Sequence, residues 1–156
     1  MDFAYIYKLL NKKQDITSFK TIFNQSIIGS GNVSGYVQIP YDFAFSVFGK
    51  PTASEQVFRF VTCRSFIIGV DPLGAVRSAA PANANAVFTV AKNGENIGTI
   101  TFSAGSNVGT ISINGTQFVF GDRLTVTAPS SQDSALTDID FSLLAVTDGE
   151  VDQIPN

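Results

Sequence analysis

From Tyr36 onward, apolar and polar residues alternate with a period of two, and this alternation limits the possible folds more than any other feature. In the first run, Phe43 and Phe45 fall on one side of the chain, and Ala44 and Ser46 fall on the other. Successive side chains of a strand point to opposite faces, so such runs are typical of strands with one buried face. Similar runs follow at 57–62, 87–90, 97–102, 108–113, 117–120, 124–128 and 139–146.

Turn-forming residues separate these runs. Asn93-Gly94 and Asn114-Gly115 each lie between two runs, and this dipeptide favours a type I′ turn because both central residues need a positive φ. We therefore expect a β-hairpin at each position. The Ala-rich stretch 78–86, which contains Pro81, predicts an extended crossover between two sheets.

The number and spacing of the runs predict the fold class. About eight short strands at about ten-residue spacing are typical of an antiparallel β-sandwich or jelly roll. We therefore expect an all-β domain whose core consists of branched aliphatic and phenylalanine side chains, since the chain has 14 Phe and no Trp. A length of 156 residues allows one such domain with an appended arm.

Residues 2–13 have the periodicity of a short amphipathic helix. Phe3, Ile6, Tyr7 and Leu10 form one apolar stripe, and the acid that begins the segment and the lysines that end it suit the helix dipole. A helix this short needs a surface to pack against. That surface is either its own domain or a neighbouring subunit, and the sequence leaves both alternatives open.

Residues 14–35 predict an extended connector, because apolar residues recur through it without a clear period. It ends in the glycine-rich stretch 29–35, whose glycines lack the spacing of a phosphate-binding loop. We therefore divide the chain into an anchoring arm at 1–39, a β-domain at 40–147 and an acidic tail at 148–156. The residues expected to contact a partner through the arm are Phe3, Tyr5, Ile6, Tyr7, Leu10, Phe19, Ile22, Phe23 and Tyr36.

The four tyrosines, Tyr5, Tyr7, Tyr36 and Tyr41, all lie in the first quarter of the chain. Tyrosine is favoured at interfaces because it buries a large area and keeps a polar tip. The alternative is that the tyrosines pack under the arm within one subunit. We favour an interface, because the apolar arm must be covered.

The composition excludes most catalytic chemistry. The chain has no histidine and a single cysteine, Cys63, which rules out Ser-His-Asp and Cys-His catalysis, an internal disulfide and a multi-cysteine zinc site. We predict that the protein is not an enzyme and needs no cofactor. Basic neighbours can lower a thiol pKa, but the flanks of Cys63 predict a small core residue. Arg59 and Arg64 either coat a strand or pair with acids of an adjacent copy.

The sequence also predicts no membrane span and no signal peptide. No apolar run approaches the length of about 18 residues that a span requires, and the N-terminus lacks a basic region before an apolar run. The three glycosylation sequons, at Asn24, Asn32 and Asn114, therefore carry little weight.

Charge is unevenly distributed along the chain. Residues 1–64 hold seven Lys or Arg and four acids, whereas residues 65–156 hold three and nine, within an overall net charge of −3. The acidic second half argues against nucleic acid as a partner, because phosphate binding needs clustered basic residues. The two halves either attract each other between copies or form two solvated surfaces.

Asp138 and Asp140 are closely spaced in a predicted strand, and the period of two places them on one face. With Asp122 or Asp133 they could supply oxygen ligands to Ca²⁺. The alternative is a solvated strand face, because the chain lacks a loop of closely spaced ligands. A glycosidase pair is not favoured, since nothing predicts the raised pKa that its acid needs.

Residues 40–146 resemble a β-sandwich module at the C-terminal ends of fibre-type proteins of tailed bacteriophages and prophages. The stretches that carry the resemblance are Pro40-Tyr41-Asp42-Phe43-Ala44-Phe45, Gly49-Lys50-Pro51, Val57-Phe58-Arg59-Phe60-Val61, Val87 to Gly94, Ile97 to Gly105, Phe120 to Val126, Ala128-Pro129, and Asp133 leading to Asp138-Ile139. The resemblance implies a structural role in the virion, with no catalytic residues.

The long shaft of such fibres is replaced here by the short arm at 1–39. This difference favours a capsid decoration or cement protein, or a short head fibre, that binds the major capsid protein and displays a homotrimer of β-domains. The alternatives are a tail fibre or baseplate component, or a module that binds host surface glycan, although glycan sites usually present exposed aromatic platforms and the chain has no Trp.

Overall fold

The computed structural model describes residues 36–71 and 73–150. Contacts between Cα atoms divide the chain into a compact unit at Gln38–Gly149 and a second unit that joins Met1–Val37 to Glu150–Asn156. The helix expected at 2–13, the connector at 14–35 and the last six residues of the predicted tail lie outside the described residues.

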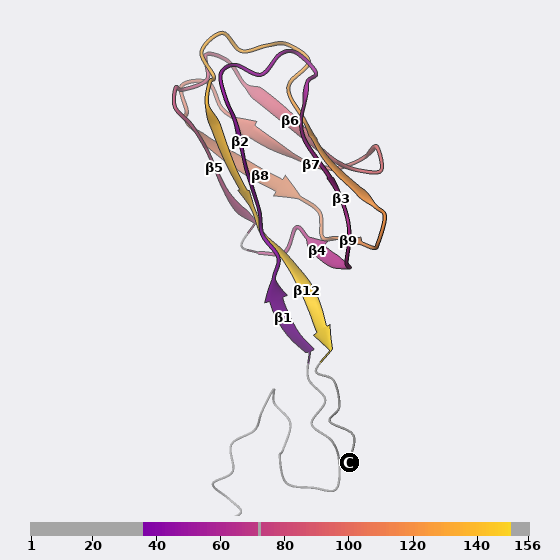
Figure 1. Cartoon of the computed structure of the whole chain (residues 1–156). Coiled ribbons are helices and arrows are strands. Elements are labelled where there is room, and N and C mark those ends of the chain that lie inside the picture. Colours follow the sequence, from indigo (N-terminus) through magenta and orange to yellow (C-terminus); the bar gives the residue numbers. More distant parts are fainter. Residues whose placement is uncertain (1–35, 72, 151–156) are drawn as a thin grey trace, which may run out of the picture. The chain divides into compact units, whose positions relative to one another are not determined.

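The described residues form twelve strands and no helix, as expected for an all-β domain (Figure 1). All the strand pairs whose register is resolved are antiparallel. The strands are β1 (Tyr36–Pro40), β2 (Phe43–Val47), β3 (Gln56–Val61), β4 (Phe66–Ile68), β5 (Gly74–Ser78), β6 (Ala86–Lys92), β7 (Glu95–Phe102), β8 (Val108–Ile113), β9 (Thr116–Phe118), β10 (Arg123–Thr127), β11 (Ile139–Leu143) and β12 (Ala145–Glu150).

Eight strands form one sheet in the order β2-β11-β5-β8-β7-β6-β10-β3, and the sheet nearly closes on itself. Its two edge strands, β2 and β3, approach each other through aromatic side chains, since the rings of Phe45 and Phe58 stack with centroids 4.2 Å apart. In Figure 1, β6, β7 and β8 lie behind β2 and β3. The closure leaves one enclosed interior for the inward faces of all eight strands.

A smaller sheet has the strand order β1-β12-β4-β9. The run at 139–146, predicted as one strand, is divided between the two sheets: β11 pairs with β2 and β5, and β12 pairs with β4. Leu144 lies at the division, where its N–H donates to the carbonyl of Leu73 at 3.1 Å. Alternation continues through such a division, so the sequence pattern does not reveal it.

The hairpin predicted at Asn93-Gly94 is confirmed. β6 and β7 pair on either side of it, and Asn93 and Gly94 have φ values of 51° and 91°. The hairpin predicted at Asn114-Gly115 is wrong, because β8 and β9 belong to different sheets. Here the backbone passes so close to Gly69 that a Cβ on Gly69 would lie 2.6 Å from the Asn114 carbonyl oxygen, and the chain continues into the smaller sheet.

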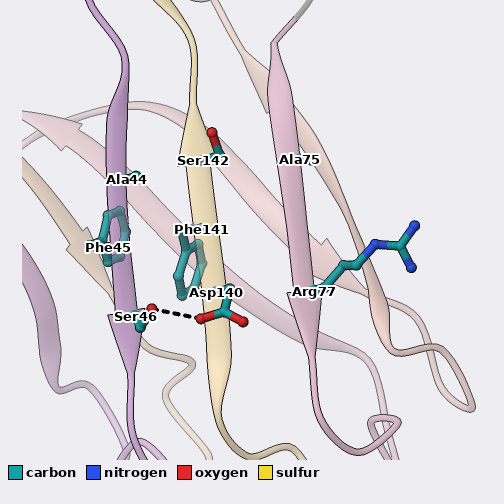
Figure 2. A pocket seen from close by; sticks show the side chains of 8 residues that line it. All are labelled: Ala44, Phe45, Ser46, Ala75, Arg77, Asp140, Phe141 and Ser142. Atoms are coloured by element: carbon teal, nitrogen blue, oxygen red, sulfur yellow. Dashed lines mark hydrogen bonds between the residues drawn. The ribbon is translucent and has the colours of Figure 1, made fainter.

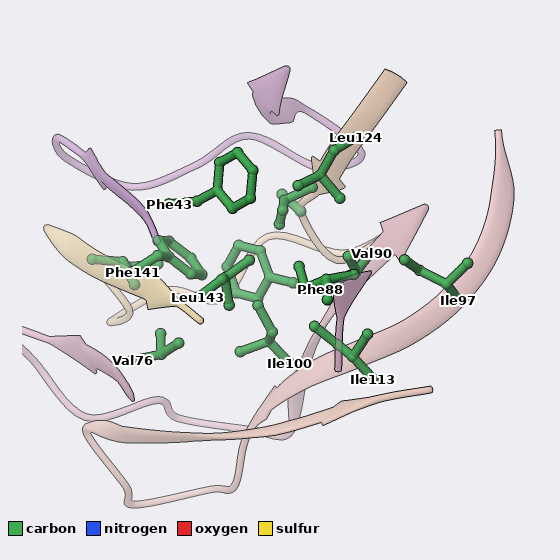
Figure 3. Close-up of a cluster of buried hydrophobic side chains, with 14 of the residues drawn as sticks. Phe43, Val76, Phe88, Val90, Ile97, Ile100, Ile113, Leu124, Phe141 and Leu143 are labelled. Carbon is green, nitrogen blue, oxygen red and sulfur yellow. The ribbon is translucent and has the colours of Figure 1, made fainter. Parts of the chain in front are cut away.

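The core fills the interior of the curled sheet, as the alternation predicts. Figure 3 shows Phe88, Phe141 and Leu143 pointing toward one another from β6 and β11. Burial of each such side chain stabilises the fold by about 1.5–3 kcal/mol. The largest fully buried side chains are Phe66, Phe88, Phe102, Phe118, Ile68, Ile100, Leu124, Leu136, Ile139, Leu143, Val76 and Val90.

Within residues 36–71 and 73–150, no helix has the length and apolar character needed to cross a bilayer.

Candidate functional site

The residues predicted to anchor the arm fall almost entirely outside the described part of the chain. Tyr36 begins β1. The other eight, Phe3, Tyr5, Ile6, Tyr7, Leu10, Phe19, Ile22 and Phe23, lie in residues 1–35. Their role at an interface therefore stays a prediction.

Tyr41 packs within its own domain. Its ring lies 5.3 Å from the centroids of both Phe43 and Phe66, and the guanidinium of Arg64 lies 5.8 Å from the centre of the Tyr41 ring. Tyr41 therefore contacts side chains of its own domain, while its place under the arm or at an interface stays a prediction. Arg64 also covers an aromatic side chain of its own domain.

The prediction that Cys63 is a core residue is wrong, because its side chain is exposed. The inward positions of β3 continue from Phe58 and Phe60 to Thr62, which is 1% exposed, so Cys63 follows on the outer side. The thiol lies 3.7 Å from the Tyr41 hydroxyl. This hydrogen bond, followed by the nearby Arg64, lowers the pKa of Cys63.

The four acids considered for Ca²⁺ binding are held separately. The prediction that Asp138 lies within a strand is wrong. Asp138 precedes β11, has a φ of 48° and accepts a hydrogen bond from the Gly49 N–H at 2.8 Å. Asp140 accepts a hydrogen bond from the Ser46 hydroxyl. Among the described residues, no three His, Cys, Asp or Glu side chains form a group that could hold a metal ion.

Asp122 and Asp133 are each surrounded by hydrogen-bond donors of the fold. The Val119 N–H, the Asn93 amide and Lys92 lower the pKa of Asp122 to about 2. Burial alone would raise the pKa of Asp133, but four backbone N–H groups outweigh burial and lower the pKa to about 2. These donors belong to Asn83, Ala84, Ala135 and Leu136. Both carboxylates therefore connect neighbouring loops or turns of the fold through hydrogen bonds.

A groove of about 480 Å³ lies on the outer face of β2, β11 and β5 (Figure 2). Its walls are low because small residues occupy the outward positions, and the register aligns Ser142 with Ala44 on one side and Ala75 on the other. The residues that line it are Ala44, Phe45, Ser46, Ala75, Arg77, Asp140, Phe141 and Ser142. Sequence reasoning identified the alternation but not this groove.

The charges of the groove lie at one end. The Ser46 hydroxyl donates to Asp140 Oδ1 at 2.6 Å, and Arg77 stands opposite Asp140 in the register of β5 and β11. Figure 2 shows the Arg77 side chain extending away from that carboxylate. The groove therefore offers a carboxylate, a guanidinium and two serine hydroxyls for contact, without a cluster of interacting acids and bases.

Two aromatic side chains on turns are strongly exposed, and sequence reasoning missed both. Phe48 is 89% exposed and Phe120 is 81% exposed. Each precedes a glycine with positive φ, Gly49 at 72° and Gly121 at 89°. A Phe-Gly pair at the end of an alternating run is the signal that could have identified them. The glycine allows a tight turn there, so the strand ends before the Phe and its side chain does not lie on the buried face.

The chain matches no protein-family model, and no curated protein matches it.

Proposed function

We propose that this protein is a structural component of a tailed-bacteriophage virion, in which residues 40–147 form a displayed jelly roll. The observation that carries the proposal is the strand order of the large sheet. If the large sheet is divided between β8 and β7, it consists of two layers of four strands, β2-β11-β5-β8 and β3-β10-β6-β7. In each consecutive pair of its eight strands, except β6-β7, the chain crosses from one layer to the other.

This order supports a jelly roll, which consists of two Greek keys and recurs in viral capsid proteins and lectins. The crossover at 79–85 supports it as well, because it joins β5 in one layer to β6 in the other. A capsid role agrees with the resemblance of residues 40–146 to a phage fibre module. We propose a role in binding and display rather than in catalysis.

The arm at 1–39 would attach the protein to the virion. Its apolar residues would bury surface on a partner, and the cost of ordering the arm would be offset when many copies bind one lattice. We propose that the partner is the major capsid protein and that the displayed unit is a homotrimer, which makes the protein a capsid decoration or cement protein, or a short head fibre.

Deletion of residues 1–35 tests this proposal. The unit at Gln38–Gly149 has its own core, so we expect the truncated protein to unfold cooperatively and to lose incorporation into particles assembled from the major capsid protein. The comparison is the full chain, measured by co-sedimentation with the particles and by light scattering for its mass. Equal co-sedimentation of both proteins would refute attachment through the arm. Binding of the full chain to tails alone would favour the fibre or baseplate alternative.

A further inference from the structure

A second pocket, of about 460 Å³, lies on the other side of the seam between the edge strands, along the outer face of β3 and β10. It is bounded by the turn between β6 and β7 and by the turn that precedes β10. The residues that line it are Gln56, Val61, Asn93, Gly94, Gly121, Arg123 and Thr125. It contains a basic side chain and no acidic one.

The backbone of Arg123 is fixed at two points. Its N–H donates to Asn93 Oδ1 at 2.8 Å, and its carbonyl accepts the Asn93 N–H at 2.9 Å. Within residues 36–71 and 73–150, no hydrogen bond or ion pair engages its guanidinium. Among the described residues, the donors of this guanidinium are therefore available to a ligand.

Asp122 precedes Arg123 in the sequence, but its carboxylate interacts with other residues. Asp122 accepts hydrogen bonds from the Val119 N–H at 2.9 Å and from Asn93 Nδ2 at 2.7 Å, and its carboxylate lies 3.1 Å from Lys92 Nζ. Arg59 adds a positive charge on the same outer face, because it stands opposite Thr125 in the register of β3 and β10. The pocket therefore favours an anion.

The remaining lining residues suit an amphiphilic ligand. Val61 is 59% exposed and offers an apolar surface, whereas the polar lining comes from the exposed Gln56 and from Thr125, which is 6% exposed. A Cβ added to Gly94 or Gly121 would meet nothing within 4 Å, so the two turns leave open space above their backbones. A sugar ring combines hydroxyl groups with an apolar C–H face.

We propose that this pocket binds an acidic sugar, with its carboxylate on the Arg123 guanidinium, its ring against Val61 and its hydroxyls toward Gln56 and Thr125. A guanidinium matches a carboxylate with two parallel hydrogen bonds, and the volume lies within the range of small-molecule sites. An acidic peptide fits less well, since a charged side chain on a flexible stem makes no use of the apolar surface beside it. The site is independent of the proposed role in the virion.

Titration of the full chain with glucuronate at low ionic strength, followed by the amide NMR signals, tests the proposal. We expect saturable shifts at the amides of Val61, Gly94 and Thr125, and much weaker binding of glucose and of acetate. Arg123→Gln removes the charged partner and should weaken binding of glucuronate about tenfold to hundredfold. The thermal unfolding of this variant should match that of the parent, because only the backbone of Arg123 is bonded.

Arg77→Gln is the matched control, since it removes the same charge from the groove on β2, β11 and β5, and Arg77 does not line this pocket. It should change the affinity less than about twofold. Three results would overturn the proposal: no saturable shifts, equal binding of acetate and glucuronate, or an equal loss in the two arginine variants.

Discussion

Phe45 and Phe58 join the two edges of the large sheet, with ring centroids 4.2 Å apart and ring planes 15° apart. Phe141 stacks on the other side of Phe45, at 4.6 Å. β2 and β3 have no strand neighbour on these edges within the large sheet, so stacked rings replace hydrogen bonds along the seam. The closure of the sheet therefore depends on side chains of a few residues.

Phe45→Ala should destabilise the domain by about 2 kcal/mol, less than the loss of about 3–5 kcal/mol for a fully buried phenylalanine, because Phe45 is the central ring of the stack but is only partly buried. Phe48→Ala is the control: it removes the same side chain from a position that is 89% exposed, and should change stability by less than about 0.5 kcal/mol. Chemical unfolding followed by circular dichroism measures both. Equal stability of the two variants would show that the seam is not held by Phe45.

Thr62→Val should stabilise the protein by about 1 kcal/mol. The Thr62 hydroxyl is buried and has no hydrogen-bond partner among the described residues, so the folded state loses the solvation of this group without compensation. Valine keeps the shape of the side chain and removes the hydroxyl. Urea unfolding of the two proteins gives the difference, and a less stable valine variant would contradict the prediction.

Gly98→Ala should destabilise the protein by about 1–3 kcal/mol. A Cβ at this position would lie 2.3 Å from the Ser112 carbonyl oxygen, which belongs to the backbone of the neighbouring strand. Gly115→Ala is the matched control, because its Cβ would have only one neighbour, at 3.9 Å. Melting temperatures compare the two, and a similar decrease in both would argue against the close approach of β7 and β8.

Stability should fall as the pH decreases from about 4 toward 2. The pKa values of Asp122 and Asp133 in the fold are about 2, below their ordinary value of 3.8, so both groups favour the folded state when ionised. Their contribution is complete above the ordinary pKa and is lost as the pH falls through the folded pKa. Thermal unfolding across this range measures the loss. The double variant Asp122→Asn, Asp133→Asn should be less stable at neutral pH and should lose less stability on acidification.

Two features of the fold follow from local sequence alone. The alternation placed Phe43, Phe45, Phe58 and Phe60 on inward faces, because in any strand successive side chains point to opposite sides. The Asn93-Gly94 hairpin follows for a similar reason, since the positive φ that its turn requires depends on two adjacent residues. In both cases the physical cause acts within a few residues.

The tertiary structure decided what depends on contacts between distant segments. The short strands β4 and β5 have no complete alternation of their own, and they form because β9, β11 and β12 supply partners for them. The same reason explains why Asn114-Gly115 leads into another sheet and why Arg123 is fixed to Asn93. Sequence alone therefore determined that these segments form strands and which of their faces are buried. Strand pairing, the closed seam and both outer pockets depend on which distant residues the fold brings together.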